Sequence, residues 1–177
     1  MVSEDFPYRQ SIRLKGFDYT NRGYYFVTIC THGRENLFGT IRNVGARPDA
    51  PDMQLNEFGR IVENNVKLMP KWKIFIDKYQ IMPNHIHLIM VISGASGQNN
   101  ISGASGRAPT KLTLGWYVGA LKTLSTRQIN RISGPLKRKI FQRNYYERII
   151  RNEKELWQAR NYIESNVANW KKDKLFN

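Results

Sequence analysis

The sequence predicts a chain of mixed strands and helices, of the α+β class. Stretches rich in β-branched and aromatic residues are typical of strands, and they occur at 23–31, 73–81 and 85–92. Apolar residues recur at helical spacing in three other stretches, at 57–69, at 110–131 and from 152 to about 170. Only a few residues separate the strands at 73–81 and 85–92, and such a tight connection favours an antiparallel pair.

Size and composition indicate one cytoplasmic domain with a polyanionic partner. A chain of 177 residues that is 41% hydrophobic is the size of a single domain with one substantial core. The net charge of +14 points to nucleic acid, with an anionic membrane surface as the second choice. We expect no membrane insertion, because no apolar run could span a bilayer and the acidic N-terminus precedes no apolar stretch. Cys30 is the single cysteine, so an intrachain disulfide and a thiolate zinc cluster are excluded.

Connecting segments account for most of the remaining chain. Residues 1–22 form a basic arm in which Arg13, Lys15 and other cations alternate with aromatic rings; this suits a nucleic-acid strand, although an ordinary solvated tail has the same composition. Residues 37–43 and 53–56 predict a hairpin with a long turn. A Gly/Ser-rich unit occurs twice within 92–109 and predicts a flexible linker. The remainder, 23–177, is expected to be one domain.

Cations are dense before the last helix. The segment 136–151 contains Lys137, Arg138, Lys139, Arg143, Arg148 and Arg151. A run of charge is usually a solvated face, but aromatic rings lie between these cations, at Phe141, Tyr145 and Tyr146, and this favours contact with nucleic acid. Lys122, in the preceding predicted helix, adds to the positive charge. Residues 145–150 predict the last strand.

The final predicted helix starts where Asn152 can cap it and Glu155 can complete a capping box. One apolar stripe follows along this helix, consisting of Leu156, Ala159, Ile163, Val167 and Trp170. Tyr162 and Asn166 are four residues apart and therefore lie one above the other on the flank of this stripe.

Two histidines stand at the entry of the strand 85–92. Side chains alternate along a strand, so His85 and His87 project to one face and Ile86, Leu88, Met90 and Ile92 project to the other. The two imidazoles are then close enough to bind one metal ion, although an isolated His-x-His is more often incidental. Ile89 and Val91 continue the histidine face as an apolar surface.

These motifs, in this order, resemble the IS200/IS605-type transposases, the single-tyrosine members of the HUH nuclease superfamily, and among them most of all the REP-associated tyrosine transposases. The resemblance spans most of residues 9 to 170. The residues that carry it are 24–28, 82–87, 121–123 and 145–152, followed by Tyr162, Ile163 and Asn166.

The resemblance implies a fold and a reaction. The fold would be a ferredoxin-like antiparallel sheet, with the histidines on a central strand and the catalytic tyrosine on a late helix. His85, His87 and Asn166 would hold Mg²⁺ or Mn²⁺, and Tyr162 would attack a phosphate. The protein would cleave and rejoin single-stranded DNA through a 5′-phosphotyrosine intermediate, at element ends or at repeats that form hairpins.

Several alternatives stay open at this point. Tyr145 and Tyr146 are rival nucleophiles, and Val167 stands where relatives often carry Pro. The Gly/Ser repeat is an extra insertion relative to the family. A DNA-binding regulator that keeps the fold without cutting, and a metal-independent RNA-binding protein, are alternative functions. A homodimer is also open, as is which subunit's tyrosine would serve which histidine pair.

Overall fold

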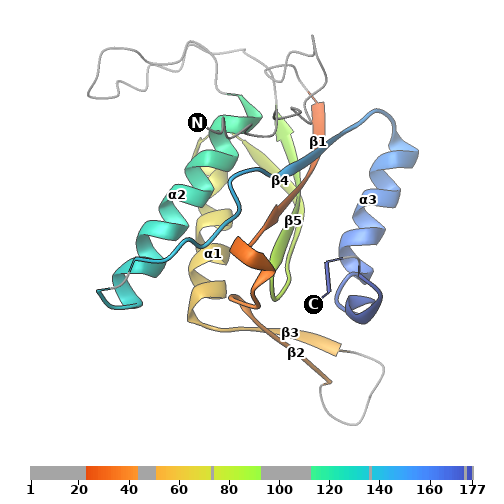
Figure 1. Cartoon of the computed structure of the whole chain (residues 1–177). Helices are drawn as coiled ribbons and strands as arrows, with labels where there is room; N and C mark the ends of the chain where they lie inside the picture. The colour runs from red at the N-terminus through yellow and green to blue at the C-terminus, as the bar shows by residue number, and fades with distance from the viewer. Residues whose placement is uncertain are drawn as a thin grey trace, which may run out of the picture.

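A computed structural model of the chain (Figure 1) describes residues 23–43, 51–72, 74–92, 113–135, 137–173 and 175–176. The predicted basic arm, with Arg13 and Lys15, lies outside the described residues, as does the Gly/Ser repeat beyond Ile92. Among the described residues, no helix is both long enough and apolar enough to cross a membrane.

A four-stranded antiparallel sheet lies at the centre of the fold. Its spatial order is β4 (Phe75–Ile81), β5 (His85–Ile92), β1 (Gly23–Cys30) and β6 (Tyr146–Ile150). All three neighbouring pairs run antiparallel, so the expected α+β class and the predicted antiparallel pair are confirmed. The histidine strand β5 is an inner strand, paired on both sides along its length.

The connectivity makes this sheet ferredoxin-like, as the resemblance implied. The chain runs β1, α1 (Glu57–Leu68), β4, β5, α2 (Leu114–Ile132) and β6, so each helix connects two strands that are separated in the sheet by a third strand. A separate hairpin of β2 (Gly39–Asn43) and β3 (Pro51–Leu55) lies between β1 and α1. The predicted hairpin is therefore confirmed, with its second strand beginning two residues earlier than expected.

Helices cover both faces of the sheet: α1 and α2 lie on one face and α3 (Glu153–Ser165) on the other (Figure 1). The alternation along β5 decides which residues face which layer. Ile86, Leu88 and Met90 belong to the large core cluster that includes α1 and α2, whereas Ile89 packs with residues of α3. The small cluster under α3 consists of Ile89, Ile150, Leu156, Ala159 and Ile163.

Helix α2 starts later than its sequence pattern indicates. The expected start was Thr110, but Thr113 supplies the cap, because its hydroxyl accepts the backbone N–H of Trp116. The helix ends at Ile132, two residues before Gly134, whose φ of +89° is a left-handed conformation that glycine adopts without strain.

Helix α3 begins as predicted and ends earlier. The side chain of Asn152 accepts the N–H of Glu155, while the Glu155 carboxylate accepts the N–H of Arg151 instead of that of Asn152. The predicted stripe continued to Val167 and Trp170, but the helix ends at Ser165. The Ser165 carbonyl accepts both the backbone N–H and the side-chain amide of Asn169, each at 3.0 Å. The backbone N–H groups of Asn166, Asn169 and Trp170 also bond to the carbonyl three residues back, so the chain tightens into turns here. Beyond this end the chain turns back toward the sheet.

Candidate active site

His85 and His87 lie side by side at the start of β5, both buried under the α3 side of the sheet. Their Nε2 atoms are 3.0 Å apart. Their outer nitrogens are held by neighbours: Nδ1 of His85 lies 2.8 Å from Oδ1 of Asn84, and Nδ1 of His87 lies 2.9 Å from the Thr28 hydroxyl. Partners on the outer nitrogens orient both Nε2 atoms toward the same point, an arrangement typical of metal-binding histidines.

Burial keeps both imidazoles neutral at physiological pH. It lowers the pKa of His85 to about 4, against an opposing effect of the Asp173 charge. It lowers the pKa of His87 to about 3, and the neighbouring His85 acts in the same direction. Neutral imidazole is the form that binds a metal ion, so neither side chain has to release a proton first.

Asp173 joins this site from the C-terminal segment, and sequence reasoning missed it. Its carboxylate and the ring nitrogens of His85 and His87 all lie within 4.8 Å of one another. It accepts hydrogen bonds from the backbone N–H of Leu175 at 2.7 Å and from the Asn166 amide at 3.0 Å. Burial alone would raise the pKa of Asp173, but these hydrogen bonds lower it below its usual value, so the group is a carboxylate.

Asn166, a predicted site residue, caps the end of α3 and is buried with 3% of its surface exposed. Its Nδ2 donates to Asp173, while its Oδ1 is buried without a hydrogen-bond partner among the described residues. An unpaired buried carbonyl oxygen is costly and calls for a ligand. The ring nitrogens of His85 and His87 and the Asp173 carboxylate form a group that could hold a divalent cation. The Asn166 oxygen is a further candidate donor, and oxygen donors are the ligands that Mg²⁺ and Mn²⁺ favour.

Tyr162, the predicted nucleophile, lies on α3 one turn before Asn166. Its ring stands edge-on to His87, with centroids 5.2 Å apart, and its hydroxyl donates to Oδ2 of Asp173 at 3.4 Å. The side chain is half-buried, and burial together with the Asp173 charge raises the pKa of the phenol. The phenol is therefore protonated at neutral pH, and its oxygen needs an electrophile polarised by positive charge.

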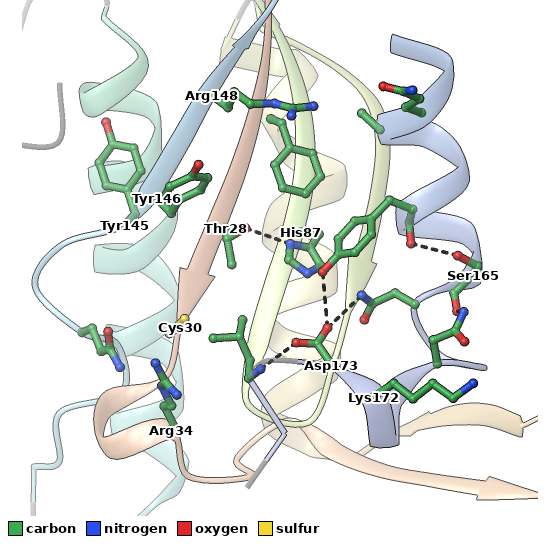
Figure 2. A pocket seen from close by; sticks show the side chains of 18 of the residues that line it. Thr28, Cys30, Arg34, His87, Tyr145, Tyr146, Arg148, Ser165, Lys172 and Asp173 are labelled. Atoms are coloured by element: carbon green, nitrogen blue, oxygen red, sulfur yellow. Dashed lines mark hydrogen bonds between the residues drawn. The ribbon is translucent and has the colours of Figure 1, made fainter. Parts of the chain in front are cut away.

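An open cleft of about 1140 Å³ leads to Tyr162, His87 and Asp173 (Figure 2). It runs between α3 and the segment that leads into β6. Arg148 and Lys172 line it with positive charge, and the rival nucleophiles Tyr145 and Tyr146 line it too. The Tyr162 ring packs against His87.

The predicted DNA-binding cations are distributed over separate places. Arg148 lines the cleft. Arg138 pairs with Glu35 at 2.7 Å, and Arg151 is exposed between β6 and α3. A second groove is lined by Lys122, Lys137, Lys139 and Arg143.

Lys122 has a structural role, which its charge alone did not indicate. Its Nζ donates to the backbone carbonyls of Gln142, Arg143 and Asn144 at 2.9 to 3.2 Å. Burial lowers its pKa to about 8. The lysine therefore fixes the segment that separates the cleft from the second groove.

Sequence signals for Asp173 were weak. It lies among lysines in 171–174, where a single acidic residue suggests only an exposed tail. The apolar stripe also predicted a helix continuing to Trp170, which would carry the chain away from the histidines. The cluster of Ser165, Asn166 and Asn169 is the one signal that the helix ends early, because such side chains compete with helical hydrogen bonds.

Comparison with known proteins gives the chain its family and fold. No protein-family model matches it. An uncharacterized protein of Haemophilus influenzae is 36% identical over 177 residues, which cover 96% of this chain and 93% of the relative.

The solved structure of a REP-associated tyrosine transposase bound to a REP hairpin matches 93% of this chain and 74% of its own length, with a TM-score of 0.53 and 16% identity. A crystal structure of a candidate transposase from Deinococcus radiodurans matches 86% of this chain and 97% of its own, with a TM-score of 0.47 and 16% identity. The chain belongs to the same family as the Haemophilus influenzae protein, and its fold is that of the REP-associated tyrosine transposase.

Proposed function

We propose that this protein is a metal-dependent DNA strand transferase that cleaves and rejoins single-stranded DNA through Tyr162. The convergence of a tyrosine hydroxyl, two neutral imidazoles and a buried, unpaired amide oxygen at the end of one basic cleft carries the proposal. The fold comparison supports it, since the tyrosine transposase of that comparison was solved with a hairpin. We extend that partner to this chain as single-stranded DNA beside a hairpin.

His85, His87 and Asn166, joined by Asp173, would hold Mg²⁺ or Mn²⁺. A divalent ion bound there would polarise a phosphate oxygen and align the scissile bond. Asp173 orients the Tyr162 hydroxyl through its hydrogen bond, and Arg148 and Lys172 bring positive charge to the DNA backbone in the cleft.

The reaction is a transesterification. The Tyr162 oxygen forms a bond to phosphorus as its proton passes to solvent through the open cleft, and the bond from phosphorus to the 3′ oxygen breaks. That 3′ oxygen takes a proton from water, and a 5′-phosphotyrosine remains. A later 3′-hydroxyl can reverse these steps on a new strand without ATP, because the phosphodiester energy is conserved in the covalent link.

A gel assay tests the proposal. Labelled single-stranded DNA carrying hairpin repeats is incubated with the protein in Mg²⁺, in Mn²⁺ or in EDTA, and covalent adducts are resolved under denaturing conditions. We expect an adduct that requires metal and disappears in Tyr162→Phe, while Tyr145→Phe and Tyr146→Phe retain it. An adduct that survives in Tyr162→Phe would move the nucleophile to Tyr145 or Tyr146.

The same assay separates the proposal from a regulator on the same fold. Such a protein would retard the DNA on a native gel and leave every strand whole, with or without metal. Binding that is indifferent to EDTA and prefers RNA would instead indicate an RNA-binding protein.

A further inference from the structure

A second groove, distinct from the cleft, concentrates positive charge between α2 and the segment 137–143. Helix α2 and this segment run side by side in Figure 1, and the groove between them has a volume of about 650 Å³. We call it the basic groove. Six cations line it, and its lining contains no acidic residue: Lys122, Arg127, Arg131, Lys137, Lys139 and Arg143.

The exposed cations of the basic groove have no acidic partner in the part of the chain that the structure describes. Among the described residues, Arg127, Arg131, Lys137, Lys139 and Arg143 have no carboxylate partner, and all five are exposed. Cations elsewhere on the surface do pair, as Arg138 does with Glu35 and Lys78 with Glu164. Like charges so close together repel one another, so this arrangement favours a polyanionic ligand.

The walls of the basic groove are fixed in the free protein. Lys122 binds three carbonyls of the segment 142–144. Asn130, on α2, donates to the carbonyl of Arg138 and accepts its backbone N–H, at 3.2 and 3.1 Å. Five hydrogen bonds thus hold the segment to α2, and the exposed cations project from a prepared surface.

The two hollows differ in what they offer to a nucleic acid. Unpaired bases bind by stacking on aromatic rings, and the cleft presents Tyr145 and Tyr146 beside Tyr162. The basic groove has one ring, Phe141, which is partly buried and packs against Phe38. Apart from the buried Ile140, its other lining groups are cations, hydroxyls and amides, which bind phosphates and leave bases untouched. Gln142 lines both hollows, so they adjoin.

We propose that the basic groove binds the phosphate backbone of the double-stranded stem of a DNA hairpin while the unpaired strand enters the cleft. The inference rests on the proposed function and adds a separate docking surface to it. The segment 142–145 would then lie at the junction of duplex and single strand, held in place by Lys122.

Equilibrium binding in EDTA tests the inference with two labelled probes, a hairpin with a single-stranded tail and the tail alone. One double variant removes charge from α2 (Arg127→Gln with Arg131→Gln), and a second removes it from the opposite wall (Lys137→Gln with Lys139→Gln). The matched control, Arg42→Gln with Lys71→Gln, removes the same charge at exposed positions outside both hollows. Thermal unfolding checks that each variant is folded.

Each groove variant is expected to weaken hairpin binding about tenfold, to lower the slope of log affinity against log salt by about two, and to leave tail binding within about twofold. The control should change both probes slightly and equally. Equal losses on both probes, or an unchanged salt slope on the hairpin, would overturn the inference while leaving the proposed function intact. A wild-type protein that binds neither probe would contradict both.

Discussion

Asp173 joins the candidate site, although its position in the sequence suggests only an exposed tail. It brings a negative charge to a pair of neutral imidazoles and accepts hydrogen bonds from both Asn166 and Tyr162. Without it, the donors would be two nitrogens and one amide oxygen, a set that binds Mg²⁺ weakly because that ion prefers charged oxygen ligands. On the proposed function, Asp173 would therefore strengthen binding of the ion and orient the phenol.

Replacing Asp173 by Asn removes the charge and keeps the shape. We expect Asp173→Asn to weaken Mn²⁺ binding about 10- to 100-fold, measured by calorimetry without DNA. Glu35→Gln, which removes a carboxylate that lies outside α3 and pairs with Arg138, is the control and should leave Mn²⁺ affinity unchanged. Equal affinity in Asp173→Asn and wild type would remove Asp173 from the metal site.

The histidine pair also makes a prediction about stability in EDTA. In the folded protein, burial lowers the pKa of His85 to about 4 and of His87 to about 3, whereas both titrate near 6.5 when unfolded. Below pH 6.5 the unfolded chain takes up protons that the folded chain does not. The free energy of unfolding should therefore fall as pH drops from about 6.5 to 4, by up to about 1.4 kcal/mol per pH unit for each histidine.

Urea unfolding between pH 7.5 and 4.5 measures this dependence. His87→Gln should show a shallower decline than wild type, whatever its absolute stability. His32→Gln is the control, because His32 is exposed at the end of the first strand, and it should keep the wild-type slope. Identical slopes in all three proteins would contradict the assignment of acid sensitivity to the buried pair.

At the scale of the element, two glycines in helices carry opposite expectations. A Cβ on Gly59 of α1 would meet the Phe38 carbonyl oxygen and the Leu55 side chain far inside van der Waals contact, whereas a Cβ on Gly119 of α2 would meet nothing within 4 Å. Gly119→Ala should stabilise the protein by about 0.5 to 1 kcal/mol. Gly59→Ala should destabilise it by about 1 to 3 kcal/mol, because the hairpin that packs on α1 must move.

Urea unfolding of the two alanine variants gives the comparison directly. Since the substitution is the same, helix propensity cancels and the difference measures how closely the β2–β3 hairpin approaches α1. A stabilised Gly59→Ala variant would mean that the hairpin adjusts at little cost.

The elements themselves show how far sequence reasoning reached. Alternation along β5 predicted correctly which residues face each layer, because a strand between two layers has one arrangement that buries both faces. The ferredoxin-like topology came from the resemblance, since strand order depends on contacts between distant segments. Helix ends were least predictable: α2 was expected to start at residue 110 and starts at Leu114, and α3 was expected to continue to about residue 170 and ends at Ser165. Because α3 was expected to continue past Ser165, Asp173 was not predicted to lie near the histidines.

On the scale of the whole molecule, we expect the site to join two parts of unequal stability, because their hydrophobic clusters differ in size. The histidines belong to the sheet and its large core, whereas Tyr162, Asn166 and Asp173 belong to α3 and the segment after it, which pack on the small cluster around Ile89. An element that makes few buried apolar contacts can open locally at a low cost in free energy. A divalent ion shared between the two sides would therefore bind the docked form of α3 in preference to an open one.

Hydrogen exchange followed by mass spectrometry tests this coupling. In EDTA, we expect the amides of α3 to exchange faster than those of β5 and α2. A divalent ion at about 100 times its dissociation constant should add about 2.7 kcal/mol to the opening free energy of α3, slowing its exchange about 100-fold while α2 changes little. Asp173→Asn at the same ion concentration should lose most of that protection. If metal slowed amide exchange in α2 and α3 equally, the ion would be stabilising the whole fold rather than the docked position of α3. The residues of α3 and of the segment after it would then contribute little to binding the ion.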